Sequence, residues 1–109
     1  MEAKATDSAV VWIGVVGVVP REGCDLLSPD KGAFVNFLTL ATSEPEYGAK
    51  VVGALSDYRL DLVEFQDVRP FSRSEEPSEE ILLIAAELEE ARDFQHVRFA
   101  TFHTFRRVM

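Results

Sequence analysis

The sequence predicts an α+β fold, a two-layer sandwich of a four-stranded mixed or antiparallel sheet with two helices on one face. Its 109 residues are a usual length for one domain. Runs rich in β-branched residues alternate with two segments of helical periodicity, in the order β-β-α-β-α-β. The stretch FQDVR at residues 65–69 also returns as FQHVR at residues 94–98, each time after a helical segment. The second half of the chain is therefore predicted to be helix-strand, helix-strand.

One domain covering residues 1–109 is expected, with a polar, frayed terminus at residues 1–8. Cys24 is the only cysteine, so a disulfide within the chain is excluded and a reducing compartment is expected. The sequence shows no secretory signal. Its apolar run at residues 9–19 is about half of the ~20 residues that a membrane-spanning helix needs. We therefore expect a cytoplasmic protein without a membrane partner.

Residues 10–19 are predicted to form the first strand, because Val dominates the run, Trp12 adds aromatic bulk and Pro20 ends it. Nearly continuous apolar character indicates a strand that is covered on both faces or buried against a partner subunit. Residues 33–42 form the second strand. The loop between them, residues 20–32, is rich in turn formers and long enough to be a candidate partner surface.

The sequence SEPE at residues 43–46 predicts the start of a helix. The Ser43 hydroxyl can accept the amide hydrogen of Glu46 while the Glu46 carboxylate accepts that of Ser43, which is a capping box. Pro45 costs little in the first turn, where its missing amide donor would have no helical partner. The apolar residues that follow share one helical stripe: Tyr47, Val51, Ala54, Leu55 and Tyr58.

Residues 60–68 are predicted to form the third strand, followed by a charged surface linker at residues 73–78. A second helix opens at Pro77 or Ser78 and continues to about Arg92, because Ala and Glu follow its apolar run. The apolar stripe of this helix comprises Ile81, Ile84, Ala85 and Leu88.

Residues 97–105 are predicted to form the last strand, and Phe on both of its sides indicates a strand that is central or covered on both faces. With both helices on one face, the other face of the sheet is left open. The chain has more phenylalanines than two helices on one face can cover: Phe34, Phe37, Phe65, Phe99 and Phe102. A homodimer that joins sheet to sheet or edge to edge is therefore expected.

The net charge of −8 disfavours nucleic acid as a partner, because phosphate binding relies on Lys and Arg. Residues 75–91 hold seven Glu and no base, whereas residues 92–109 hold four Arg. The acidic segment either pairs with the basic one internally or binds a basic partner, as small acidic inhibitors of toxins do. Candidate partner-binding residues are Glu79, Glu80, Glu87, Glu89 and Glu90. The leading hypothesis is a non-enzymatic, immunity-like or regulatory protein that binds another protein or itself.

The alternative hypothesis is a small ligand-binding or catalytic domain. His103 is its candidate catalytic residue, because His titrates near neutral pH. The cavity would lie between sheet and helices, lined by Trp12, Phe99, Phe102 and His103. His96 and His103 are seven residues apart and fall on opposite sides of an ideal strand, so they do not resemble a zinc pair. The glycine-rich phosphate-binding motifs are absent. Neither a metal nor a cofactor is expected.

Overall fold

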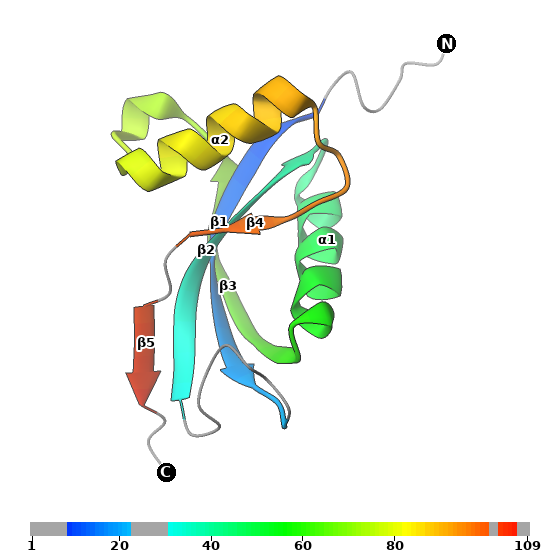
Figure 1. The fold of residues 1–109 in the computed structure, drawn as a ribbon, viewed down its shortest axis with the longest axis vertical. Coiled ribbons are helices and arrows are strands. Elements are labelled where there is room, and N and C mark those ends of the chain that lie inside the picture. The colour runs from blue at the N-terminus through cyan, green and yellow to red at the C-terminus, as the bar shows by residue number, and fades with distance from the viewer. Residues whose placement is uncertain (1–8, 23–30, 101–102, 107–109) are drawn as a thin grey trace.

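The computed structural model describes residues 9–22, 31–100 and 103–106, the last group and residue 31 by their backbone alone. Its elements confirm the α+β class and the order in which strands and helices follow one another (Figure 1). They are β1 (Val10–Pro20), β2 (Lys31–Ala41), α1 (Glu44–Asp57), β3 (Leu60–Pro70), a 3₁₀ turn (Arg73–Glu75), α2 (Glu79–Ala91), β4 (Arg98–Phe99) and β5 (His103–Arg106).

All described strand pairs are antiparallel, and the sheet has the order β3-β1-β2-β4. The last expected strand is divided in two, because β4 pairs with Phe37 and Leu38 whereas β5 pairs with residues 31–34, further along the same side of β2. This part of the chain therefore lies at an edge of the sheet and not at its centre. β3, with its row of charged side chains, forms the opposite edge.

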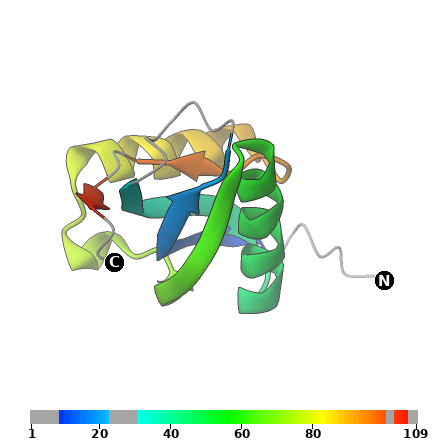
Figure 2. The same cartoon turned by 90° about the horizontal axis from the view of Figure 1, so that it is seen from below.

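The two helices pack on opposite faces of the sheet, in contrast to the expected arrangement on one face. On β2, Val35 and Phe37 join the buried cluster that contains the apolar stripe of α1. Leu38 and Leu40 join a second cluster that contains the stripe of α2 (Figure 2). Since neighbouring residues such as Phe37 and Leu38 point to opposite sides of a strand, the two clusters lie on the two faces. The nearly continuous apolar character of the first two strands is the sequence signal for this arrangement.

Helices on both faces cover most of the phenylalanines that argued for a sheet-to-sheet dimer. Phe37 is fully buried, and Phe65 and Phe99 pack against the α1 cluster. Phe34 is half-buried, and Phe102 lies outside the described residues. The premise of a sheet face left bare along its whole length therefore does not hold.

Helix α1 begins with the Ser43 cap that the sequence predicts, since the Ser43 hydroxyl accepts from the Glu46 amide at 3.3 Å. The Glu46 carboxylate turns to Thr42 and not to the Ser43 amide. It accepts from the Thr42 amide at 2.7 Å and from the Thr42 hydroxyl at 2.6 Å. The hydrogen bonds from Thr42 lower the pKa of Glu46, and the nearby charge of Lys50 acts in the same direction.

Tyr47 anchors α1 to the middle of the sheet. Its side chain is fully buried, and its hydroxyl donates to the Phe37 carbonyl at 2.9 Å, with the Gly14 carbonyl at 3.5 Å. Burial raises the pKa of Tyr47, so the hydroxyl keeps its proton. A Cβ atom on Gly14 would lie 2.9 Å from both the Tyr47 hydroxyl and a Val68 methyl. Gly14 therefore leaves the space into which the tyrosine fits.

A β-bulge in β3 lies opposite Gly14. Ile13 pairs with Arg69 and Val15 pairs with Gln66, so that β3 has one extra residue between these pairs. Asp67, within the bulge, has a φ of 54°, in the left-handed region. Such a bulge interrupts the hydrogen-bonding edge of β3 and protects it against pairing with another chain.

We expect Gly14→Ala to destabilise the protein by about 1–3 kcal/mol, because the new methyl group must displace Tyr47 or Val68. Gly53→Ala is the matched control, since nothing lies within 4 Å of a Cβ at this helical position. It should stabilise α1 by up to about 1 kcal/mol. Denaturant unfolding measures both changes, and equal effects of the two substitutions would contradict the role of Gly14.

We expect the Thr42–Glu46 contact to make stability depend on pH. A carboxyl group whose pKa is lowered by folding contributes its full stabilisation above its unfolded pKa, and loses it as the pH falls through the folded value. Thermal unfolding of wild type and Glu46→Gln should therefore differ near neutral pH and converge in acid. Glu44→Gln, which removes an exposed carboxylate from the same turn, is the control. A constant difference between wild type and Glu46→Gln at all pH values would refute this account.

Candidate functional site

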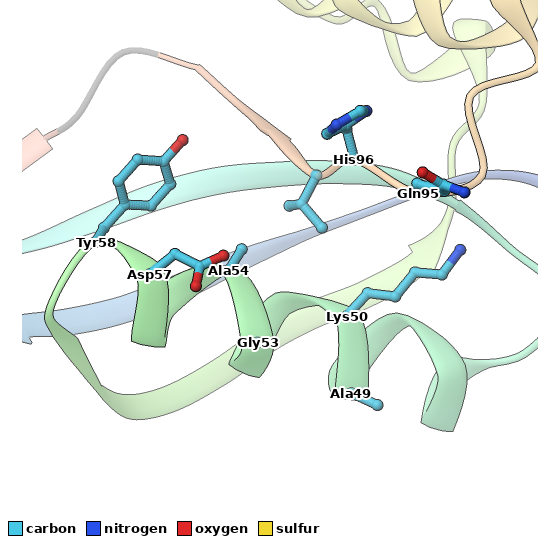
Figure 3. A pocket seen from close by; sticks show the side chains of 9 residues that line it. Ala49, Lys50, Gly53, Ala54, Asp57, Tyr58, Gln95 and His96 are labelled. Atoms are coloured by element: carbon cyan, nitrogen blue, oxygen red, sulfur yellow. The ribbon is translucent and has the colours of Figure 1, made fainter.

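An open groove of about 550 Å³ lies between α1 and the segment that connects α2 to β4 (Figure 3). Its volume is within the range of small-molecule sites. Its lining residues are Ala49, Lys50, Gly53, Ala54, Asp57, Tyr58, Gln95, His96 and Val97. The α1 side is low, because Ala49, Gly53 and Ala54 have small side chains or none. The opposite wall is the segment that connects α2 to β4, at residues 93–97.

The wall at residues 93–97 is held by hydrogen bonds from several directions. The Asp93 carboxylate accepts from the backbone amides of Gln95 and His96, both at 3.1 Å. Burial opposes ionisation of Asp93, but these bonds together with His96 outweigh it and lower its pKa. The buried Thr39 hydroxyl donates to the His96 carbonyl at 3.1 Å, which fixes the wall to β2.

The His96 ring is oriented by the same carboxylate. Its Nδ1 lies 3.1–3.2 Å from the two Asp93 oxygens. Because a carboxylate accepts hydrogen bonds, Nδ1 carries the proton, and in the neutral ring Nε2 is the acceptor. The side chain is 74% exposed. The groove therefore has an oriented imidazole at its rim.

Lys50 joins α1 to strand β2 and to the segment that connects α2 to β4. Its ammonium donates to the Leu40 carbonyl and to the Phe94 carbonyl, each at 2.7 Å. It also lies 3.4 Å from the carboxylate of Glu46. These three partners match the three donors of an ammonium group, so Lys50 has a structural role at its end of the groove.

The other end of the groove is negative. Asp57 is the last residue of α1, and the last turn of that helix has no basic residue. Within the described part of the chain, no hydrogen bond or ion pair engages the Asp57 carboxylate. Next to it, the Tyr58 ring packs edge-on against Phe99, with 5.5 Å between the ring centres.

Two of the four sequence candidates for a cavity lie away from the groove. Trp12 and Phe99 pack against the α1 cluster, and neither lines the groove. Trp12 pairs with Thr39 on β2 and His103 pairs with Phe34, which puts the two five residues apart along that strand, about 17 Å. The side chains of Phe102 and His103 lie outside the described residues, so a cavity there stays a prediction.

His96 is the site residue that the sequence reasoning passed over. Its signal was the echo itself, since FQDVR and FQHVR differ only by Asp67 and His96. The spacing of Asp93 and His96 allows a turn in which the carboxylate reaches the ring.

Two glutamates of α2 form ion pairs with other parts of the chain. Glu87 pairs with Arg98 at 2.8 Å and Glu89 pairs with Arg73 at 2.9 Å, so these two hold the helix to the rest of the protein. The outward stripe of α2 consists of the exposed residues Glu79, Leu83, Ala86, Glu87 and Glu90. Leu83 is 60% exposed, the most exposed large apolar residue described. Glu80 is also exposed.

Among the described residues, no group of three or more His, Cys, Asp or Glu is placed to hold a metal ion. None of the helices in this part of the chain has the length and apolar character needed to span a bilayer. Most of the loop at residues 20–32, including Cys24, lies outside the described residues.

We expect Lys50→Met to destabilise the protein by about 1–3 kcal/mol, because the carbonyls of Leu40 and Phe94 lose their charged donor. Amide hydrogen exchange should accelerate at residues 94–97 in particular. Val52→Ala, a truncation at an exposed position of the same helix, is the control. An unchanged exchange rate in the wall would show that Lys50 does not hold it.

No protein-family model, curated protein or solved structure matches this chain.

Proposed function

We propose that this chain is a cytoplasmic, non-enzymatic binding protein that docks a basic surface of another protein through the outward stripe of α2. The observation that supports this most is Leu83, a large apolar side chain that is 60% exposed within an acidic helix face. Glu79 lies one turn before it and Glu87 one turn after it. An apolar centre with a charged rim is the usual organisation of a protein interface.

The charge of this face argues for a basic partner. Helix α2 contains five Glu and no basic residue. Arg98 and Arg73 neutralise Glu87 and Glu89 from the inner side, whereas no described ion pair involves Glu79 or Glu90. With a net charge of −8, the protein attracts a positively charged partner over a distance and repels an acidic one. An immunity-like or regulatory role is consistent with such selectivity.

A second copy of the chain is a poor partner for this surface. Two α2 faces brought together would place Glu79 and Glu90 against like charges, which is unfavourable. A homodimer through another surface remains a prediction. Light scattering at low and high salt distinguishes it from a monomer of 12.2 kDa. The alternative of a small ligand-binding or catalytic domain with a cavity near His103 stays a prediction, because the His103 side chain lies outside the described residues.

We expect a photo-crosslinking residue at position 83 to capture a specific basic protein in the native cell. The same residue at position 52 on α1, where Val52 is 48% exposed, is the matched control and should not capture it. With the captured protein purified, Leu83→Ala should weaken binding about fivefold or more. Glu79→Lys with Glu90→Lys should slow association and reduce its salt dependence.

Identical adducts from positions 83 and 52 would contradict the docking surface. So would binding that survives Leu83→Asp in a variant whose thermal unfolding matches the wild type. Because Leu83 is largely exposed, this substitution is expected to leave the fold intact.

A further inference from the structure

We propose that the groove beside α1 binds a guanidinium or alkylammonium group, with the positive charge at the end formed by Asp57 and Tyr58. This site is separate from the outward stripe of α2, and the inference does not depend on the function proposed for that stripe. The proposal rests on the charge at the end of α1, on the acceptors that face the groove, and on the open space above Gly53.

The C-terminal end of α1 carries a negative charge that no described ion pair neutralises, although the basic residue Arg59 follows two residues after Asp57. A helix carries about half a negative charge at its C-terminus, so an acidic residue there is unfavourable and a cation is stabilised. Asp57 adds a full carboxylate at this point, and the last turn provides no basic residue. Among the described residues nothing pairs with that carboxylate. The combination favours a cation from outside the chain.

The acceptors around Asp57 suit a ligand with several N–H donors. The Asp57 carboxylate offers two acceptor oxygens. The Tyr58 hydroxyl adds a group that both accepts and donates, and its ring offers a π-face to a cation. Figure 3 shows Asp57 and Tyr58 at one end of the groove, whereas the His96 ring points away from α1. A planar guanidinium, which has five donors, can use several of these acceptors at once.

The body of the groove suits an alkyl chain. Gly53 and Ala49 lie on α1 four and eight residues before Asp57, so this floor extends for about 12 Å. Gly53 lowers helix propensity, yet no atom lies within 4 Å of its missing Cβ, so no contact within the fold requires a glycine there. Lys50 and its partner Glu46 stand at the far end, and the Lys50 ammonium is already fully bonded. The ligand's charge is thus directed to the Asp57 end.

The same chemistry has two sources, a free alkylguanidine and an arginine side chain of another protein. We would titrate the isotope-labelled full chain with N-butylguanidinium, and separately with a terminally blocked pentapeptide whose only charged residue is a central arginine. N-butylurea, a neutral isostere, is the control ligand. The amides of residues 53–58 and 95–97 should shift saturably with either cationic ligand and not with N-butylurea.

Two variants test the site directly. Asp57→Asn should raise the dissociation constant about tenfold, since it removes a charge-assisted hydrogen bond. Gly53→Leu should abolish binding by filling the floor, and Gly53→Ala gives the effect of a methyl group alone. Glu44→Gln, which removes an exposed carboxylate at the other end of α1, should change nothing. Thermal unfolding checks that each variant is folded.

Tighter binding of the peptide would assign the site to a partner's arginine, and tighter binding of N-butylguanidinium would assign it to a free metabolite. Either result supports the proposal. It is overturned if neither ligand produces saturable shifts in the groove, or if Asp57→Asn and Glu44→Gln weaken binding equally. The latter result would mean that the overall negative charge of the protein attracts the cation, and not a specific site in the groove.

Discussion

The buried hydroxyl of Tyr47 is the contact on which the arrangement of the fold depends. A phenol in an apolar interior must find a hydrogen-bond partner, and the one available here is a carbonyl of β2 at 2.9 Å. To reach it, the ring passes over β1 at a position without a side chain, Gly14. On the edge strand β3, the Phe65 ring packs against the Tyr47 ring, with 6.2 Å between the ring centres. The bulge of β3 lies opposite Gly14, where β1 has no side chain. Helix, glycine and bulge are therefore parts of one packing solution.

The two central strands are covered on both sides because each helix takes one set of alternating residues. To provide this cover, the connection that contains α2 must cross from the β3 edge to the β4 edge. Its final turn then passes alongside α1, where Lys50, in the middle of the helix, donates to the Phe94 carbonyl. The groove lies at this meeting point, so its existence follows from the two-sided packing. Neither wall forms a site without the other.

The charged side chains also form a pattern on the protein. The basic side chains of Arg21, Lys50, Arg69, Arg73 and Arg98 are each paired with a carboxylate of the chain. Most of these pairs are exposed and contribute little to stability individually. Their consequence is that positive charge is engaged within the protein while carboxylates such as Asp57, Glu79 and Glu90 face solvent.

The sequence by itself determined the class, the element order and the local signals. Periodicity marked the buried stripes of both helices, and Ser43 and Ser78 cap them. These features depend on neighbours in the chain, so a single sequence contains them.

Tertiary structure alone decided the rest. The five residues 65–69 lie within an extended strand, whereas their near copy at residues 94–98 forms a turn that leads into β4. Their partners differ, β1 for the first and Asp93, Thr39 and Lys50 for the second. Which face each helix covers, and which residues meet in the groove, depends on contacts between positions distant in sequence, which local patterns do not encode.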